Sequence, residues 1–189
     1  MVYQGGPKMK IKKIVLVGMF SGLLAIISPL QIIIPFSPVP ITLQVVGMVL
    51  AGGILGSRLG FLSVLIYTIL GLVGLPIFAG FKSGLPALIG PTGGYIIGFI
   101  AAAYIIGKLV EVKAEPGLAY IIFANMIGLI VLYTIGTLQL SFIYTHSIYK
   151  ALLAGVLPYI IPDLIKILFS SILTIQVRKV LIKSGYLVP

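Results

Sequence analysis

The sequence contains no cysteine and no tryptophan, and only three of its residues are acidic. Without cysteine the chain has no disulfide framework, no thiolate metal ligand and no cysteine nucleophile. Charged residues make up 8% of the 189 residues and hydrophobic residues 60%, whereas soluble domains carry about 25% charged and about 45–50% apolar residues. A core of this size cannot hide so much apolar surface, so the composition indicates a membrane protein.

Motifs for several kinds of chemistry are also missing. The chain has no GxxxxGK[ST] sequence, and hence no nucleotide-binding P-loop. His146 is the only histidine, and it has neither metal-binding partners nor a serine and aspartate arranged with it for catalysis. We therefore expect a chain that is not an enzyme and has no metal and no cofactor. It can bind a solute, but it has no visible means of driving transport alone.

The formal net charge of +10 raises the question of a nucleic-acid partner. Binding of nucleic acid requires a basic face on a soluble fold. Here the lysines and arginines flank apolar runs instead, so we expect no nucleic-acid partner.

Six apolar segments are candidates for membrane-spanning helices, which need about 20 residues each. They are 11–27, 41–55, 59–73, 94–110, 116–140 and 151–182. Prolines prevent a continuous helix between the first two segments, and Pro116 suits the first turn of the fifth helix. The expected fold is an all-α membrane protein with one six-helix domain at 11–183. A tail at 1–10, part of which could be a tag, precedes it.

Basic residues are distributed unequally between the two sides of these six segments. If the N-terminus is cytoplasmic, the outer side carries only Lys82, Lys150 and His146. The cytoplasmic side then carries Lys8, Lys10, Lys12, Lys13, Arg58, Lys108, Lys113, Arg178, Lys179 and Lys183. The positive-inside rule therefore predicts that both termini are cytoplasmic. The proline-rich segment, the stretch 71–95 and the loop before Lys150 then face outward and can converge on one pocket.

The stretch 71–95 is rich in glycine and proline and is unlike a lipid-spanning helix. We interpret it as a lid or pocket wall, with its PTGG sequence as a turn into the next helix. Its one charge, Lys82, either meets a carboxylate or is a solvated loop residue. Tyr95 is a candidate wall residue, as is Tyr67, for which a place in the aromatic belt at the membrane surface is the alternative.

Asp163 and Lys166 are ionisable residues deep inside a predicted span. Their spacing places them on one helix face, and a charge in a membrane normally faces a cavity or a partner. Pro158 and Pro162 leave backbone carbonyls free nearby, which is tolerated where the backbone lines a cavity. We expect the pair to contact a polar ligand near the outer end of the helix. The alternative is an ion pair that neutralises itself between helices.

Other polar and small residues have two interpretations each. Gln44 opens the second predicted helix on the outer side, close to the same pocket. Asn125 either contacts the ligand or forms an interhelical hydrogen bond. In the first helix, small-xxx-small pairs allow another helix to approach closely, either within the chain or from a partner. These pairs are Gly18 with Gly22 and Ser21 with Ala25.

Three motifs in order along the chain resemble a known family. ITLQ at 41–44, GLPIFAG at 74–80 and GPTGGYIIGF at 90–99 are similar to segments of BioY, the biotin-binding S components of energy-coupling factor (ECF) transporters. The resemblance covers about 12 to 180, and the Asp163–Lys166 pair fits the family's substrate-contacting pair. It implies a six-helix fold in a prokaryotic cell membrane, with an outward biotin site closed by the loops after the first and third helices.

The resemblance also implies partner proteins, and this chain differs from some family members at one position of the expected site. A transmembrane coupling subunit and two cytoplasmic ATPase subunits would supply the missing P-loop, and the small-residue pairs of the first helix correspond to the family's AxxxA motif that faces the coupling subunit. Some members carry an asparagine ligand where this chain has Gly80. Lys82, Ser83 or a backbone group are the candidates to replace it.

The chemistry of biotin agrees with these residues. Its ureido N–H groups need acceptors and its ureido oxygen needs a donor, which Asp163, Lys166 and Gln44 can supply. Its apolar parts need an apolar sleeve, and the valerate carboxylate could meet Lys82 or the turn amides around 92–94, which include Thr92 and Gly93. The expected sleeve residues are Phe78, Phe81, Leu85 and Tyr95.

The expected function is capture of biotin from outside for ATP-driven uptake. The alternative is a passive channel or facilitator for a small solute, in which the glycine-rich stretch is a gate.

Overall fold

The computed structural model describes residues 7–186, with side chains from residue 11 onward, so residues 1–6 of the predicted tail lie outside the described part. Within it, helices dominate and one antiparallel pair of short strands is present, β1 (Gln31–Ile32) and β2 (Ile41–Thr42). The helices are α1 (Pro7–Ile27), α2 (Gln44–Leu72), α3 (Leu85–Ile89), α4 (Gly93–Glu111), α5 (Leu118–Leu140), α6 (Ile148–Gly155) and α7 (Ile160–Lys183). Short helical turns occupy Ala79–Phe81, Ser141–Thr145 and Leu157–Tyr159.

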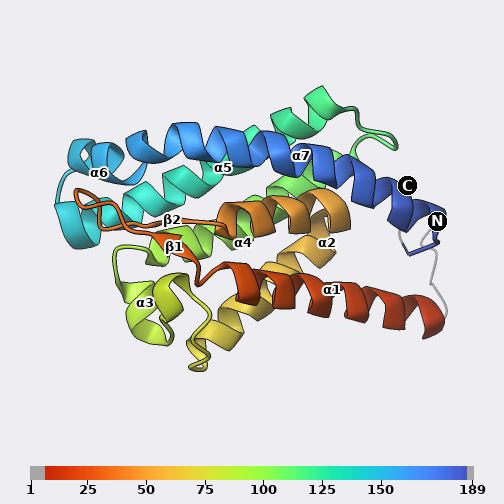
Figure 1. Ribbon diagram of the computed structural model, residues 1–189, viewed down its shortest axis with the longest axis horizontal. Helices are drawn as coiled ribbons and strands as arrows, with labels where there is room; N and C mark the ends of the chain where they lie inside the picture. Colours follow the sequence, from red (N-terminus) through yellow and green to blue (C-terminus); the bar gives the residue numbers. More distant parts are fainter. Residues whose placement is uncertain (1–6, 187–189) are drawn as a thin grey trace.

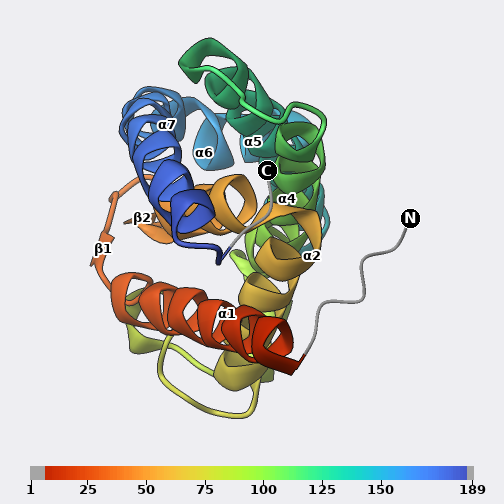
Figure 2. The ribbon, with the colours of Figure 1, turned by 90° about the vertical axis from the view of Figure 1, so that its right-hand side faces the viewer.

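The long helices run between two ends of the molecule that differ in character (Figure 1). The start of α1 and the end of α7 lie at one end, which we call the termini end. There the Lys12 Nζ donates to the Gly185 carbonyl at 3.1 Å. Strands β1 and β2 and the short helices α3 and α6 gather at the opposite end, which we call the loop end. Figure 2 views the bundle from the termini end.

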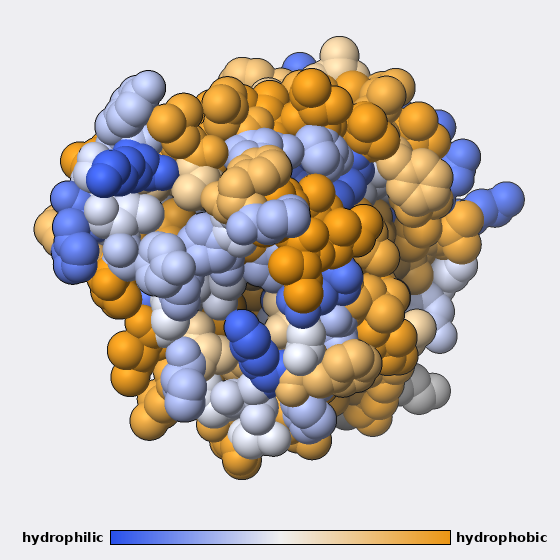
Figure 3. All heavy atoms as spheres, turned by 60° about the vertical axis from the view of Figure 1, so that its left-hand side comes forward, coloured by the Kyte–Doolittle hydropathy of each residue, from blue (hydrophilic) through white to orange (hydrophobic). Residues whose placement is uncertain are grey.

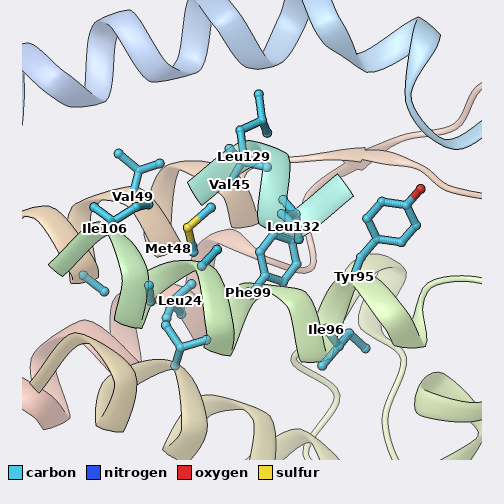
Figure 4. Packing of buried hydrophobic residues seen from close by; sticks show 14 of the residues in the cluster. Leu24, Val45, Met48, Val49, Tyr95, Ile96, Phe99, Ile106, Leu129 and Leu132 are labelled. Atoms are coloured by element: carbon cyan, nitrogen blue, oxygen red, sulfur yellow. The ribbon is translucent and has the colours of Figure 1, made fainter. Parts of the chain in front are cut away.

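The centre of the bundle is the packing of α2 against α4 and of α4 against α5. Met48, Ala103 and Ile106 are fully buried there, and Figure 4 shows Met48 and Ile106 among the apolar side chains between these helices. Small residues bring the backbones together, since a Cβ on Gly52 would lie 2.5 Å from the Ala103 carbonyl oxygen. Residues of these packed helices, Val45, Phe99 and Leu132, also line the cavity at the loop end.

The two helices predicted at 41–55 and 59–73 form one element, α2, that is broken at Gly56. This glycine has φ +83° and ψ −175°, a conformation that residues with a Cβ rarely adopt. The second half turns back along the first (Figure 1), and a Cβ on Gly60 would lie 2.7 Å from the Ala51 oxygen. The predicted division into two helical segments agrees with this break, but the break is made by one residue instead of the stretch 56–58. Residues 41–42, predicted as the start of a helix, form β2.

Side chains from two other helices satisfy the backbone at this break. Glu111, at the end of α4, accepts hydrogen bonds from the Ser57 N–H at 2.7 Å and from its hydroxyl. Arg178, near the end of α7, donates to the Ile54 carbonyl at 3.2 Å. Polar backbone groups that a helix break frees are thus paired inside the protein, as buried polar groups require.

The predicted helix at 151–182 is also interrupted. Its first part is α6, and α7 begins only after a tight turn at Leu157–Tyr159 that contains Pro158. Pro162 lies in the first turn of α7, where a missing N–H costs nothing because these N–H groups have no partner within the helix. Pro116 likewise precedes the fifth helix rather than opening it, since α5 begins at Leu118 after Gly117.

Among the described residues, four helical segments have the length and apolar composition to cross a membrane. They are Gln44–Leu72, Gly93–Glu111, Leu118–Thr145 and Ile148–Lys183. Large apolar side chains such as Ile161, Ile165 and Phe169 cover the outer face of α7. The protein is therefore a helical multi-pass membrane protein.

Candidate functional site

A cavity opens at the loop end, bounded by β2, the starts of α2, α4 and α7, the middle of α5 and the turn at Ala79–Phe81. Its empty volume, including the open mouth, is about 680 Å³. Figure 3 shows hydrophilic residues gathered around a hollow on this face, with apolar surface on the flanks.

Asp163 and Lys166 lie on the cavity wall at the start of α7. Asp163 is only 3% exposed. Its Oδ1 is 2.8 Å from the Lys166 Nζ, and its Oδ2 accepts from the Tyr133 hydroxyl at 2.8 Å. The carboxylate lies in the first turn, where the helix dipole favours negative charge. The two residues do form an ion pair, but within one helix and facing the cavity rather than between helices.

Gln44 is held in one orientation at the start of α2. Its amide Nε2 donates to the Tyr67 hydroxyl at 2.7 Å, and its Oε1 accepts from the Thr42 hydroxyl at 3.1 Å. Tyr67 in turn donates to the Ile77 carbonyl at 3.2 Å. Tyr67 is buried and does not line the cavity, so neither the wall nor the aromatic-belt interpretation applies, and its hydroxyl supports the Gln44 amide.

The predicted turn before the fourth helix is present, and α4 begins at Gly93. Thr92 and Tyr95 line the cavity. Gly93 does not line it; a Cβ there would meet the Leu88 carbonyl, so Gly93 lets the turn pack tightly. The Tyr95 hydroxyl donates to the Gly155 carbonyl at 2.8 Å, which joins the start of α4 to the end of α6.

The turn at Ala79–Phe81 brings Phe78 and Lys82 to the cavity. Phe78 is buried and packs edge-on against Tyr67, with ring centroids 5.7 Å apart. Ser83 does not line the cavity. Phe81 and Leu85 are 67% and 64% exposed, which contradicts the prediction that they form part of the apolar sleeve.

Sequence reasoning missed two tyrosines that line the cavity. Tyr133 lies in the apolar α5 and donates to Asp163, and nothing in the sequence connects these two positions. Tyr159 precedes α7 and bonds to the Ser37 hydroxyl at 2.7 Å and to the Val39 carbonyl. The second contact ties the proline-rich segment to α7, so this segment forms part of the cavity's mouth.

Gly80 has φ +67°, and another residue fills the space that a side chain at this position would occupy. A Cβ on Gly80 would lie 2.9 Å from the Gln31 Cδ, so the carboxamide of β1 occupies that position. Gln31 was not among the predicted replacements for an asparagine at position 80. Only its carboxamide chemistry could have suggested it.

The two small-residue pairs of α1 face in different directions. Gly18 and Gly22 are exposed, and a Cβ on either would meet nothing within 4 Å. Ser21 is buried and donates to the Ser63 carbonyl at 2.9 Å, while Ala25 packs against the core. Only the glycine pair is therefore open to another molecule.

Asn125 lies away from the cavity. It is buried in α5 and its Nδ2 donates to the Ser171 hydroxyl of α7 at 2.9 Å. The interhelical interpretation of this amide is therefore confirmed.

Comparison with known proteins identifies the family. The model of the BioY family matches residues 4–183. The chain belongs to the BioY family. It is 39% identical over 168 residues to the biotin transporter BioY of Thermotoga maritima, covering 89% of this chain and 96% of the relative. It is 44% identical over 158 residues to the probable biotin transporter BioY of Pyrococcus horikoshii, covering 84% and 91%.

A solved structure agrees with this BioY assignment. The crystal structure of the S-component for biotin from an ECF-type ABC transporter matches with a TM-score of 0.86 and 28% identity. The match covers 93% of this chain and 95% of that one. The family resemblance inferred from the motifs at 41–44, 74–80 and 90–99 is therefore confirmed.

Proposed function

We propose that this BioY chain is the substrate-binding membrane subunit of an ECF-type transporter and captures biotin from outside for ATP-driven uptake. The observation that carries the proposal is the Asp163–Lys166 pair on the wall of a cavity. The fold around that cavity matches an S-component for biotin.

The cavity offers what each part of biotin needs. Each Asp163 oxygen makes one hydrogen bond and has lone pairs left for the ureido N–H groups. Lys166 and Gln44 can donate to the ureido oxygen. Phe78 and Tyr95 supply apolar contact for the ring, and Lys82 faces the same space for the valerate carboxylate.

We propose six membrane spans, which are α1, the two halves of α2, α4, α5 and α7. The common position of the termini and the basic residues near them support cytoplasmic termini in a prokaryotic cell membrane. The loop end then faces outward, with the cavity mouth toward the biotin source.

The proposed partners are a transmembrane coupling subunit and two cytoplasmic ATPase subunits. The outer face of α1 carries Ile14, Met19 and Ile26 around the open glycine pair. A helix can approach closely over Gly18 and Gly22 because no side chain separates the backbones.

Reconstitution tests the proposal against a passive channel. Purified protein in vesicles should bind labelled biotin without letting it cross, and uptake should require the coupling and ATPase subunits with ATP. Biotin flux through the chain alone would overturn the proposal in favour of a facilitator. Absence of biotin binding, with the fold intact by thermal unfolding, would overturn the substrate assignment.

A further inference from the structure

A second cavity lies at the termini end, between the α4–α5 connection, the start of α5 and the end of α7. Its empty volume, including its mouth, is about 880 Å³. Arg178 follows Asp163 by fifteen positions along α7, or about 22 Å at 1.5 Å per residue. The end of α7 and the start of α5 both come forward in Figure 2. This cavity is therefore separate from the proposed biotin site.

The charged residues that line this second cavity are predominantly basic. Arg178, Lys179 and Lys183 line it, against a single carboxylate from Glu115. Among the described side chains the one ion pair within 4 Å is Lys166–Asp163, so none of these three cations is paired. The cavity therefore carries an excess of positive charge that an anion would neutralise.

Arg178 is the strongest indication of a ligand. It is 7% exposed, and its buried Nε has no hydrogen-bond partner among the described residues. Glu111 does not form an ion pair with it, because its carboxylate binds the backbone and hydroxyl of Ser57. A buried guanidinium that lines a cavity without a carboxylate partner is costly unless an anion neutralises its charge.

The rest of the lining is apolar. Ile121 of α5 and Ile175 and Ile182 of α7 form the wall beside the cations. Cations next to apolar side chains at the end of a membrane helix match an amphiphile, with a charged head and an acyl chain. A small inorganic anion would use the cations but not the isoleucines.

We propose that this cavity binds an anionic phospholipid, with the headgroup phosphate at Arg178 and Lys179 and the acyl chains along the isoleucines. Basic pockets between membrane helices on the cytoplasmic side are suited to such headgroups. The site depends on the protein's place in the membrane and not on the identity of the solute at the loop end.

Lipid binding to the purified protein in detergent tests the proposal. Native mass spectrometry and thermal unfolding are measured with phosphatidylglycerol and with phosphatidylcholine of the same acyl chains. We expect phosphatidylglycerol to be retained and to raise the unfolding temperature, with phosphatidylcholine at least fivefold weaker. Equal binding of the two lipids would overturn the proposal.

Matched charge reversals separate the cavity from general attraction. Lys179→Glu should weaken phosphatidylglycerol binding at least fivefold, because this exposed lysine lines the cavity. Lys108→Glu makes the same change in net charge at an exposed position at the end of α4, and should change binding less than twofold. Equal losses in the two variants would show non-specific attraction and overturn the proposal.

Two further measurements test the headgroup contact and its source. Arg178→Gln should lose phosphatidylglycerol stabilisation while biotin binding at the loop end reports that the fold is intact; retained stabilisation in folded protein would remove Arg178 from the site. If the variant does not fold, the result for Lys179→Glu tests the headgroup contact instead.

Glycerol 3-phosphate should stabilise the protein at least tenfold less effectively than the lipid. Equal effectiveness would mean a soluble-anion site and overturn the lipid assignment.

Discussion

The cavities at the two ends of the molecule handle buried charge in opposite ways. At the loop end, Lys166 is paired with Asp163, and the Tyr133 hydroxyl donates a hydrogen bond to the other oxygen of the same carboxylate. At the termini end, Arg178 donates to a backbone carbonyl and has no carboxylate within 4 Å. A paired centre presents acceptors and donors without net charge, which suits a neutral group such as a ureido ring. An unpaired cation suits an anion.

Removing the acid of the paired centre should have the largest effect. Asp163→Ala leaves Lys166 and the Tyr133 hydroxyl without their partner and removes the proposed ureido acceptor. We expect a loss of about 2 kcal/mol in biotin binding, the scale for hydrogen bonds to charged groups, or roughly 30-fold in Kd. Isothermal calorimetry measures it. Glu115→Ala, which removes an acid from the other cavity, is the control, and unchanged affinity in Asp163→Ala would exclude Asp163 from the site.

A smaller effect is expected where the pair is kept and only its support is lost. Tyr133→Phe removes the hydroxyl that donates to Asp163 Oδ2 and keeps the ring. We expect about 1 kcal/mol weaker biotin binding, since the carboxylate becomes less well oriented. Tyr144→Phe, at an exposed position in the turn after α5, is the matched control. If both variants bind like the parent protein, the hydroxyl has no part in orienting Asp163.

The Gln31 carboxamide above Gly80 offers a test by exchange. Gln31 does not itself line the cavity; if its amide still contacts the ligand, Gln31→Ala should cost about 0.5–1 kcal/mol in biotin binding. Adding Gly80→Asn should restore it, because asparagine tolerates positive φ and the space is then free. Gly80→Asn alone should push the flexible Gln31 carboxamide aside, since its Cβ would approach Gln31 Cδ to 2.9 Å. A Gln31→Ala variant with parental affinity would show that this amide does not contact the ligand.

A change on the outer face of α1 should leave both cavities unaffected. Gly22→Leu places a side chain over the open surface, so we expect reduced co-purification with the coupling subunit and biotin affinity within twofold of the parent protein. Met19→Leu on the same face, which adds almost no volume, is the control for substitution without added bulk. Normal yield of the complex with Gly22→Leu would argue against this face as the contact surface.

Much of the fold was predictable because apolar length and helix-breaking residues determine membrane spans. The prediction of 94–110 lies within one residue of α4 at each end, and 116–140 within two of α5. The Asp163–Lys166 spacing likewise placed both charges on one face of α7. These features depend on neighbours along the chain, which a sequence displays directly.

The remaining parts of the site depend on contacts between distant residues. Tyr133 meets Asp163 from another helix, and Tyr159 meets Ser37 across 122 positions. Phe81 was misassigned for a related reason: in a membrane protein an apolar side chain can face lipid or solvent as readily as a ligand. Burial there is decided by packing that no local pattern reports.

The break at Gly56 has a consequence for how the chain matures during synthesis. Its two freed backbone groups are satisfied by Glu111 and Arg178, which follow 54 and 124 positions later. The turn between the two halves of α2 can therefore reach its final form only after α7 has been made. We expect the hairpin formed by the two halves of α2 to lack its final backbone geometry until α7 has been synthesised. The C-terminal helix then fixes the conformation of a turn in the N-terminal half of the chain.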